Sequence, residues 1–289
     1  MQARWRKIWA AALATSLAVL GAQAVGASPA TAATLPPGSV KQFNTQSPFT
    51  TEAVKSFSAS CLAGQRVLGG GAFTVGGVHA VITEMQPIHP ATGVDSFKVT
   101  AAADQFGIPF AWSFQVFVFC ATVPSSMQLE IVNHTDPPTS AILHDTPVRC
   151  PAGKIVVGTG GKIDNGGGQV DLGTGPNGLT GMGALAKEDA DGFAGNYTVT
   201  AYAVCASSSI IADVSRVLAS IADAEPSQKV VLGCPTGMEL TGIAAETSLP
   251  GTHLQQIRPT QANLATFGTQ SSTPQNQVSN LTYAVYCIK

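Results

Sequence analysis

Five histidines are the residues best suited to proton transfer near neutral pH. They are His79, His89, His134, His144 and His253. Asp145 follows His144 directly, but neighbours on a strand face opposite sides of a sheet, so the two side chains cannot pair. The chain has no G-x-S-x-G nucleophile elbow and no H-E-x-x-H metal motif. The histidines are therefore interpreted as ordinary surface residues, with catalysis by His144 and a distant serine as the alternative.

A second candidate is the acidic run Glu188-Asp189-Ala190-Asp191-Gly192. Closely spaced carboxylates beside a glycine turn suit calcium, which prefers oxygen ligands. The run is too short for an EF-hand loop. A solvated acidic turn is the main interpretation, and a calcium site formed by Glu188, Asp189 and Asp191 is the alternative. No other cofactor is expected.

Two further chemistries find little support in the sequence. Paired carboxylates for glycoside hydrolysis could come from Glu84, Asp95 and Asp104, but nothing selects two of them. Three copies of G-x-x-x-x-G have the glycine spacing of a phosphate-binding loop, yet none is followed by the required Lys and Ser/Thr. Nucleotide binding is therefore not expected.

Six cysteines mark three copies of one unit. Each copy opens with C-x-x-G-x-x-x-x-G, carries a proline about 26 residues later, and closes on a second cysteine. The opening residues are Cys61, Gly64 and Gly69; Cys150, Gly153 and Gly158; and Cys234, Gly237 and Gly242. The closing cysteines are Cys120, Cys205 and Cys287. These markers predict three tandem repeats of about 85 residues, at 34–120, 121–205 and 206–289.

The repeats are expected to be all-β. Each closing cysteine ends an alternating run typical of a strand with both faces partly covered. In each opening, the first glycine is expected in a turn that needs positive φ, and the second at a bulge or a close backbone approach. Small β-sandwich or prism-like units are predicted, with a pseudo-threefold arrangement as one possibility.

One segment is ambiguous. Apolar residues between Ile210 and Ile221 fall at helical spacing, whereas the corresponding Met127–Ile131 alternates like a strand. Because repeats must fill the same place in the fold, a strand is favoured over a helix in the third unit.

The cysteine pairing has two regular solutions. Bonds within units would join Cys61 to Cys120, Cys150 to Cys205 and Cys234 to Cys287. Bonds between units would join Cys120 to Cys150 and Cys205 to Cys234, with Cys61 and Cys287 closing a ring. The first is favoured because it makes each unit self-contained and needs no contact between distant ends of the chain.

Five aromatic residues offer a further possibility. Trp112, Tyr197, Tyr202, Tyr283 and Tyr286 lie near the closing cysteines. They are expected in the core, with a sugar-stacking platform as the alternative.

The N-terminus resembles a secretory leader. Arg4, Arg6 and Lys7 precede an apolar run and an Ala30-Thr31-Ala32 cleavage box, which predicts a signal peptide at 1–33. Its removal leaves 12 basic and 17 acidic residues, a net charge of −5. A mildly acidic exported protein is a poor match for nucleic acid. A secreted, extracellular protein is expected, with no membrane span after leader removal.

The openings Cys150-Pro151 and Cys234-Pro235, together with the Tyr-Ala-Val endings, resemble secreted bacterial repeat proteins with C-P-x-G openings and Y-A-V-C endings. Leu62 departs from that opening in the first unit. Those proteins have no assigned activity, so the resemblance implies a class and no chemistry.

The preferred hypothesis is a non-catalytic binding or cell-envelope-associated protein with an unknown extracellular ligand, either glycan or protein. Repetition multiplies similar surfaces, whereas a single active site needs residues that break the repeat. One alternative is a secreted hydrolase whose site is built from unit-specific loops near His79, His89, His144 and Glu188–Asp191. Another is an inhibitor or toxin-like factor that acts on another protein.

Overall fold

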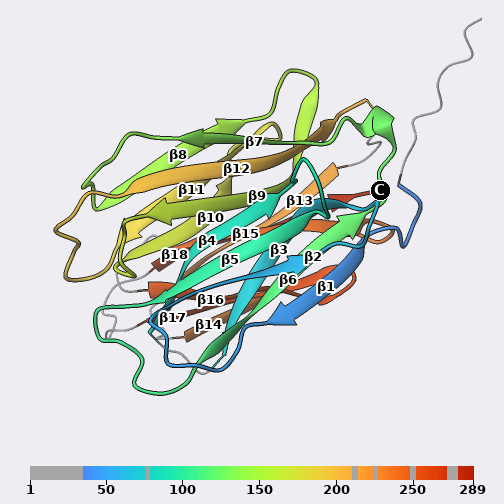
Figure 1. Cartoon of the computed structure of the whole chain (residues 1–289). Helices are drawn as coiled ribbons and strands as arrows, with labels where there is room; N and C mark the ends of the chain where they lie inside the picture. The colour runs from blue at the N-terminus through green and yellow to red at the C-terminus, as the bar shows by residue number, and fades with distance from the viewer. Residues whose placement is uncertain (1–34, 76–78, 210–213, 224–226, 248–251, 272–278) are drawn as a thin grey trace, which may run out of the picture. The chain divides into compact units, whose positions relative to one another are not determined.

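The computed structural model describes residues 35–75, 79–209, 214–223, 227–247, 252–271 and 279–289 (Figure 1). These residues form an all-β structure in which the only helical element is one short 3-10 turn, as the turn-rich sequence predicts. No helix of this part is long and apolar enough to cross a membrane. The leader expected at 1–33 lies outside the described residues.

Each of the three sequence units supplies six of the strands. The first supplies β1 (Lys41–Gln46), β2 (Val54–Ser60), β3 (Arg66–Val75), β4 (Ala80–Ile88), β5 (Ser96–Ala103) and β6 (Ser113–Ala121). The second supplies β7 (Glu130–Thr135), β8 (Leu143–Arg149), β9 (Lys154–Asp164), β10 (Val170–Pro176), β11 (Gly181–Glu188) and β12 (Thr198–Ser207). The third supplies β13 (Val214–Asp223), β14 (Ser227–Gly233), β15 (Glu239–Thr247), β16 (Thr252–Gln261), β17 (Leu264–Ser271) and β18 (Ser279–Ile288).

The closing runs are central strands, as expected. β6 lies between β1 and β3, β12 between β7 and β9, and β18 between β13 and β15. In β6 every side chain except the partly exposed Gln115 is buried. Burial on both faces explains why Phe and Val stand at consecutive positions here instead of alternating with polar residues.

All three disulfides form within units: Cys61–Cys120, Cys150–Cys205 and Cys234–Cys287. This is the first of the two regular pairings. The reason given for preferring it is wrong, however, because the units are not self-contained.

The sheets are open and combine strands from different units. One has the order β1-β6-β3-β16-β17-β14 and a second β2-β5-β4-β9-β12-β7, while β10-β11-β8 and β13-β18-β15 are three-stranded. Figure 1 shows the orange-red strands β14, β16 and β17 beside the earlier β1, β3 and β6. The joints are the antiparallel pairs β3–β16 and β4–β9. Residues 32–289 accordingly form one compact body.

The ambiguous segment is a strand where it is described. β13 pairs along its length with β18, which confirms the strand interpretation, and residues 210–213 lie outside the described part. The second unit differs from expectation. A 3-10 turn occupies Ser125–Met127, Gln128 has a φ of 46°, and β7 begins only at Glu130. A left-handed residue ends the turn and sets where the strand starts.

The opening glycines have the two roles predicted for them. Gly64, Gly153 and Gly237 have φ values of 79°, 79° and 83°, a region that side chains with a Cβ rarely adopt. At the second glycine, each strand carries one extra residue relative to its neighbour. These bulged residues are Leu68 in β3, Val157 in β9 and Thr241 in β15.

The second glycines bring β3, β9 and β15 into direct backbone contact. A Cβ on Gly69 would lie 2.5 Å from the carbonyl oxygen of Thr241. A Cβ on Gly158 would overlap the carbonyl oxygen of Leu68, and one on Gly242 would lie 2.9 Å from that of Val157. Each glycine thus faces the bulged residue of another unit, and only a hydrogen fits in the space.

This contact makes Gly158→Ala a specific test of the packing. The added methyl group must displace backbone, so we expect a loss of about 3 kcal/mol in the free energy of unfolding. Gly153→Ala is the matched control: its Cβ meets nothing within 4 Å, and backbone strain alone costs about 1 kcal/mol. Equal losses for the two variants in urea unfolding, with disulfides intact, would contradict this packing.

Candidate functional site

A groove of about 620 Å³ runs over one face of the sheet that joins the first and second units. Its floor is polar and comes from four adjacent strands: Ser56 on β2, Thr100 on β5, Glu84 on β4 and Lys162 on β9. Strand alternation places these side chains on the same face, opposite the core. The groove therefore exists only because β4 pairs with β9.

The charged groups of the floor are already paired. Glu84 is almost fully buried; it accepts a hydrogen bond from Thr100 and lies 2.9 Å from Lys98 Nζ. Lys162 Nζ lies 2.7 Å from the carboxylate of Asp164, which raises the pKa of Lys162 against the opposing effect of burial. This leaves a floor of fixed dipoles and hydroxyl groups without an uncompensated buried charge.

One wall of the groove holds an exposed aromatic ring. Phe106 follows β5 and is 66% exposed, and its backbone N–H donates to Asp104 Oδ1 at 2.9 Å. The other Asp104 oxygen lies 2.7 Å from His79 Nδ1. The His79 ring packs against the Phe106 ring, with the two ring centroids 5.7 Å apart. A buried carboxylate and a histidine thus hold the backbone and ring of an exposed phenylalanine.

A second wall is the glycine-rich loop 164–168 between β9 and β10. Asn165, Gly167 and Gly168 all have positive φ, as the turn signals in this run predict. A Cβ on Gly168 would overlap the carbonyl oxygen of Ala103, so this loop abuts the end of β5. The two walls therefore meet at one end of the groove.

The aromatic residues singled out in the sequence do not form this wall. Trp112, Tyr197, Tyr202, Tyr283 and Tyr286 are buried, which confirms core packing and excludes them as a surface platform. Among the residues that the structure describes, the exposed large aromatic side chains are instead Phe49, Phe106 and Phe110. No local sequence pattern marks them as exposed, because an aromatic residue in a loop can equally be interpreted as part of the core.

All five histidines contact aspartates. The pairs are His79–Asp104, His89–Asp95, His134–Asp136, His144–Asp136 and His253–Asp171. His144 therefore bonds Asp136 and not its neighbour Asp145, and no serine bonds it within the described residues. Burial acts to raise the pKa of Asp136, but hydrogen bonds from Thr146, His144 and His134 lower it overall.

The three candidate glycosidase carboxylates lie in separate contacts and do not pair with one another. Glu84 contacts Lys98 and Thr100, Asp95 contacts Arg66 and His89, and Asp104 contacts His79. Each is held by a basic or hydroxyl group, so their arrangement gives no acid and base facing one substrate.

The acidic run is partly buried and not a solvated turn. Glu188 and Asp189 are buried; Glu188 accepts from the Phe193 N–H at 3.2 Å, and Gln105 donates to Asp191 at 2.8 Å. In the part of the chain that the structure describes, no three His, Cys, Asp or Glu side chains are arranged to hold a metal ion. The geometry therefore does not favour the calcium alternative at Glu188, Asp189 and Asp191. Burial, together with the neighbouring Asp191 carboxylate, raises the pKa of Asp189 to about 6.

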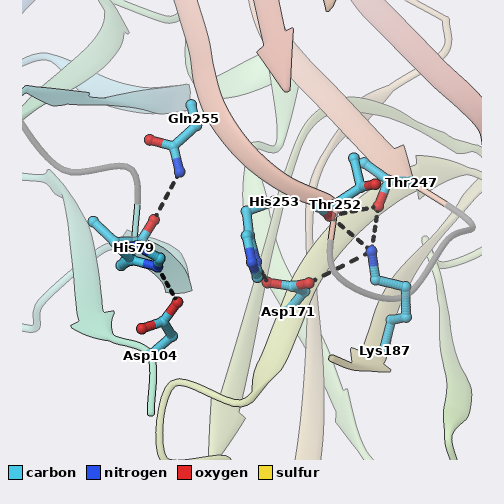
Figure 2. Close-up of polar contacts among 9 residues, drawn as sticks. His79, Asp104, Asp171, Lys187, Thr247, Thr252, His253 and Gln255 are labelled. Carbon is cyan, nitrogen blue, oxygen red and sulfur yellow. Dashed lines mark hydrogen bonds and ion pairs between the residues drawn. The ribbon is translucent and has the colours of Figure 1, made fainter. Parts of the chain in front are cut away.

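A cluster of three ionisable side chains lies in the interior, and no sequence pattern marks it (Figure 2). Asp171 on β10 lies 2.6 Å from His253 Nδ1 on β16 and 3.5 Å from Lys187 Nζ on β11. Lys187 also donates to the backbone oxygen of Thr252 at 2.8 Å and to the hydroxyl of Thr247. The cluster thus connects the second unit to the third.

Its protonation follows from burial opposed by pairing. Burial acts to raise the pKa of Asp171, but the charges of His253 and Lys187 lower it overall. Burial lowers the pKa of Lys187 despite its contact with Asp171. Burial acts to lower the pKa of His253, but the Asp171 charge raises it overall. The aspartate is therefore anionic, and the cluster is a buried ion network.

This network has no room for a substrate. The space beside Asp171, Lys187, Thr247 and Thr252 is about 10 Å³, which is enough for no more than about one water molecule. The contacts of this network therefore join sheets.

Comparison of the chain with protein-family models and with curated proteins found no match.

Lys187→Met tests the structural role of the buried network. The variant leaves the Asp171 carboxylate without its ammonium partner, so we expect a loss of about 3 kcal/mol in the free energy of unfolding, measured in urea. Lys41→Met, which removes an exposed ammonium, should cost less than about 0.5 kcal/mol. A loss below about 1 kcal/mol for Lys187→Met would show that the network does not hold the sheets.

Asp189→Asn tests the raised acid. With a folded pKa of about 6 against an ordinary value of 3.8, the protonated form favours folding, and this contribution is lost as pH rises from about 4 through 6. The variant should therefore gain about 1 kcal/mol over the parent at pH 7 and almost nothing at pH 4. Urea unfolding at four pH values measures this difference, with the exposed Glu52→Gln as control. Parallel pH profiles for parent and Asp189→Asn would contradict the assignment.

Proposed function

We propose that the protein is a secreted, non-catalytic binding protein that acts outside the cell or at the cell envelope. The observation that carries the proposal is the groove over β2, β5, β4 and β9, whose volume lies in the range of ligand sites. Its polar groups are held by neighbours instead of being poised for proton transfer. Such a surface is suited to recognition.

The extracellular location has two supports. Three disulfides are typical of chains that fold in an oxidising compartment, and the first 33 residues have the pattern of a secretory leader. The resemblance to secreted bacterial repeat proteins belongs to the same proposal.

We further propose that the three units are repeats that pack around one pseudo-threefold axis. The matching positive-φ glycines, the three bulges and the reciprocal contacts of Gly69, Gly158 and Gly242 support this arrangement. So does the strand order, in which the fourth strand of one unit pairs with the third strand of another at both β4–β9 and β16–β3.

The joints between units carry different side chains. Glu84 faces Lys162 where β4 meets β9, whereas Gln256 faces Phe73 where β16 meets β3. At the remaining joint Gly173 lies against Glu246. The expectation that repetition multiplies similar surfaces is therefore not met at these positions, and we place the ligand at the β4–β9 joint alone.

The hydrolase alternative has less support. It places a site in unit-specific loops near His79, His89, His144 and Glu188–Asp191. Of these, His144 bonds Asp136 and, within the described residues, no serine. Action as an inhibitor or toxin-like factor on another protein remains a form of binding that the test below also detects.

Filling the groove tests the proposal. Ser56 is exposed on the groove floor, so Ser56→Trp should block the groove without removing a buried contact and weaken binding to cell walls of the producing species at least tenfold in co-sedimentation. Ser58→Trp is the matched control, because Ser58 is the next exposed residue on the same face of β2 but does not line the groove. Cell-wall binding that is absent, or equal in the two variants, would contradict the proposed function.

A further inference from the structure

We propose that the groove binds a neutral saccharide, with the Phe106 ring as its stacking surface. This inference rests on the proposed function and names its ligand class. It depends on three features of the groove: an exposed ring held in place, carboxylates that are already paired, and an amide on the second wall without a side-chain hydrogen bond.

Phe106 is exposed yet held in place. Its N–H is fixed by Asp104, its ring is backed by His79, and Gly107 completes the turn through a 3.0 Å hydrogen bond to the Asp104 carbonyl oxygen. Water contact with an apolar ring is unfavourable, and preorganisation lowers the entropy cost of binding. The ring is therefore suited to cover the apolar C–H face of a ring-shaped ligand.

The charge balance of the groove favours a neutral ligand. Its charged lining residues are Glu84, Asp104, Asp164 and Lys162, three anions and one cation, which disfavours polyanions. The anions are not free for a cationic ligand either, because Lys98, His79 and Lys162 hold them. What the floor presents is hydroxyl groups and bound carboxylate oxygens, such as Ser56 and Thr100, whose hydroxyl oxygens lie 2.7 Å apart.

Asn165 supplies directional hydrogen bonding from the other wall. Its amide makes no side-chain hydrogen bond within the described residues, and Asn165 lines the groove from the glycine-rich loop. An amide offers both a donor and an acceptor, which matches a hydroxyl group. A pyranose combines a C–H face for Phe106 with hydroxyl groups at its edge, so it satisfies both walls at once.

Calorimetric titration of the purified protein tests this inference with four neutral trisaccharides: maltotriose, cellotriose, mannotriose and triacetylchitotriose. A heparin hexasaccharide and hexalysine serve as charged comparators. We expect at least one neutral trisaccharide to bind and Phe106→Ala to weaken it at least tenfold, while Phe106→Trp retains binding. Phe110→Ala is the matched control, because Phe110 is also an exposed loop ring but does not line the groove.

The inference is overturned if no neutral trisaccharide binds, if heparin or hexalysine binds more tightly, or if Phe106→Ala and Phe110→Ala have equal effects. Thermal unfolding of both variants confirms that the exposed substitutions leave the fold intact. If Ser56→Trp weakens cell-wall binding but no neutral trisaccharide binds, only the saccharide proposal is overturned. If, in addition, cell-wall binding is absent or insensitive to Ser56→Trp, the proposed function is overturned as well.

Discussion

The structure depends on the close approach of three backbones, those of β3, β9 and β15. Their glycines meet the carbonyl groups of bulged residues at distances that exclude a Cβ. Bulges bend the strands and increase their twist, which allows each sheet to turn away from this contact. Because the contact is made of backbone, it leaves the side chains of the joints free to differ.

Burial along the joints is balanced by specific pairing. Asp171, His253 and Lys187 are ionisable groups that are almost fully buried, and burying such groups is tolerated only when each has a partner. Asp171 contacts both basic groups, so the cluster links two strands of the second unit to one strand of the third. The disulfides add a constraint of a different kind, because each joins residues of a single unit.

The proposed binding groove depends on buried supports. Asp104 and His79 hold the loop that carries Phe106. Glu84 is held by Thr100 on the neighbouring strand β5. Rigid sheets with short loops at their ends are a common way to position recognition groups precisely. The groove is open, whereas the space beside the buried network is closed, and this difference in access separates the proposed recognition surface from structural support.

The sequence by itself determined the strand content and the roles of Gly64 and Gly69 and their counterparts, and it left two regular cysteine pairings. The strand content follows from the alternation of side chains along the chain, and the glycine roles follow from backbone conformation, both of which nearby residues specify. The sequence did not determine that β4 pairs with β9, that Asp171 meets His253, or that Phe106 is exposed while Trp112 is buried. These contacts join residues far apart in the chain, and their energies arise only once the sheets exclude water from one face and leave the other open. Tertiary structure therefore decided the groove, and the local pattern decided the strands that form it.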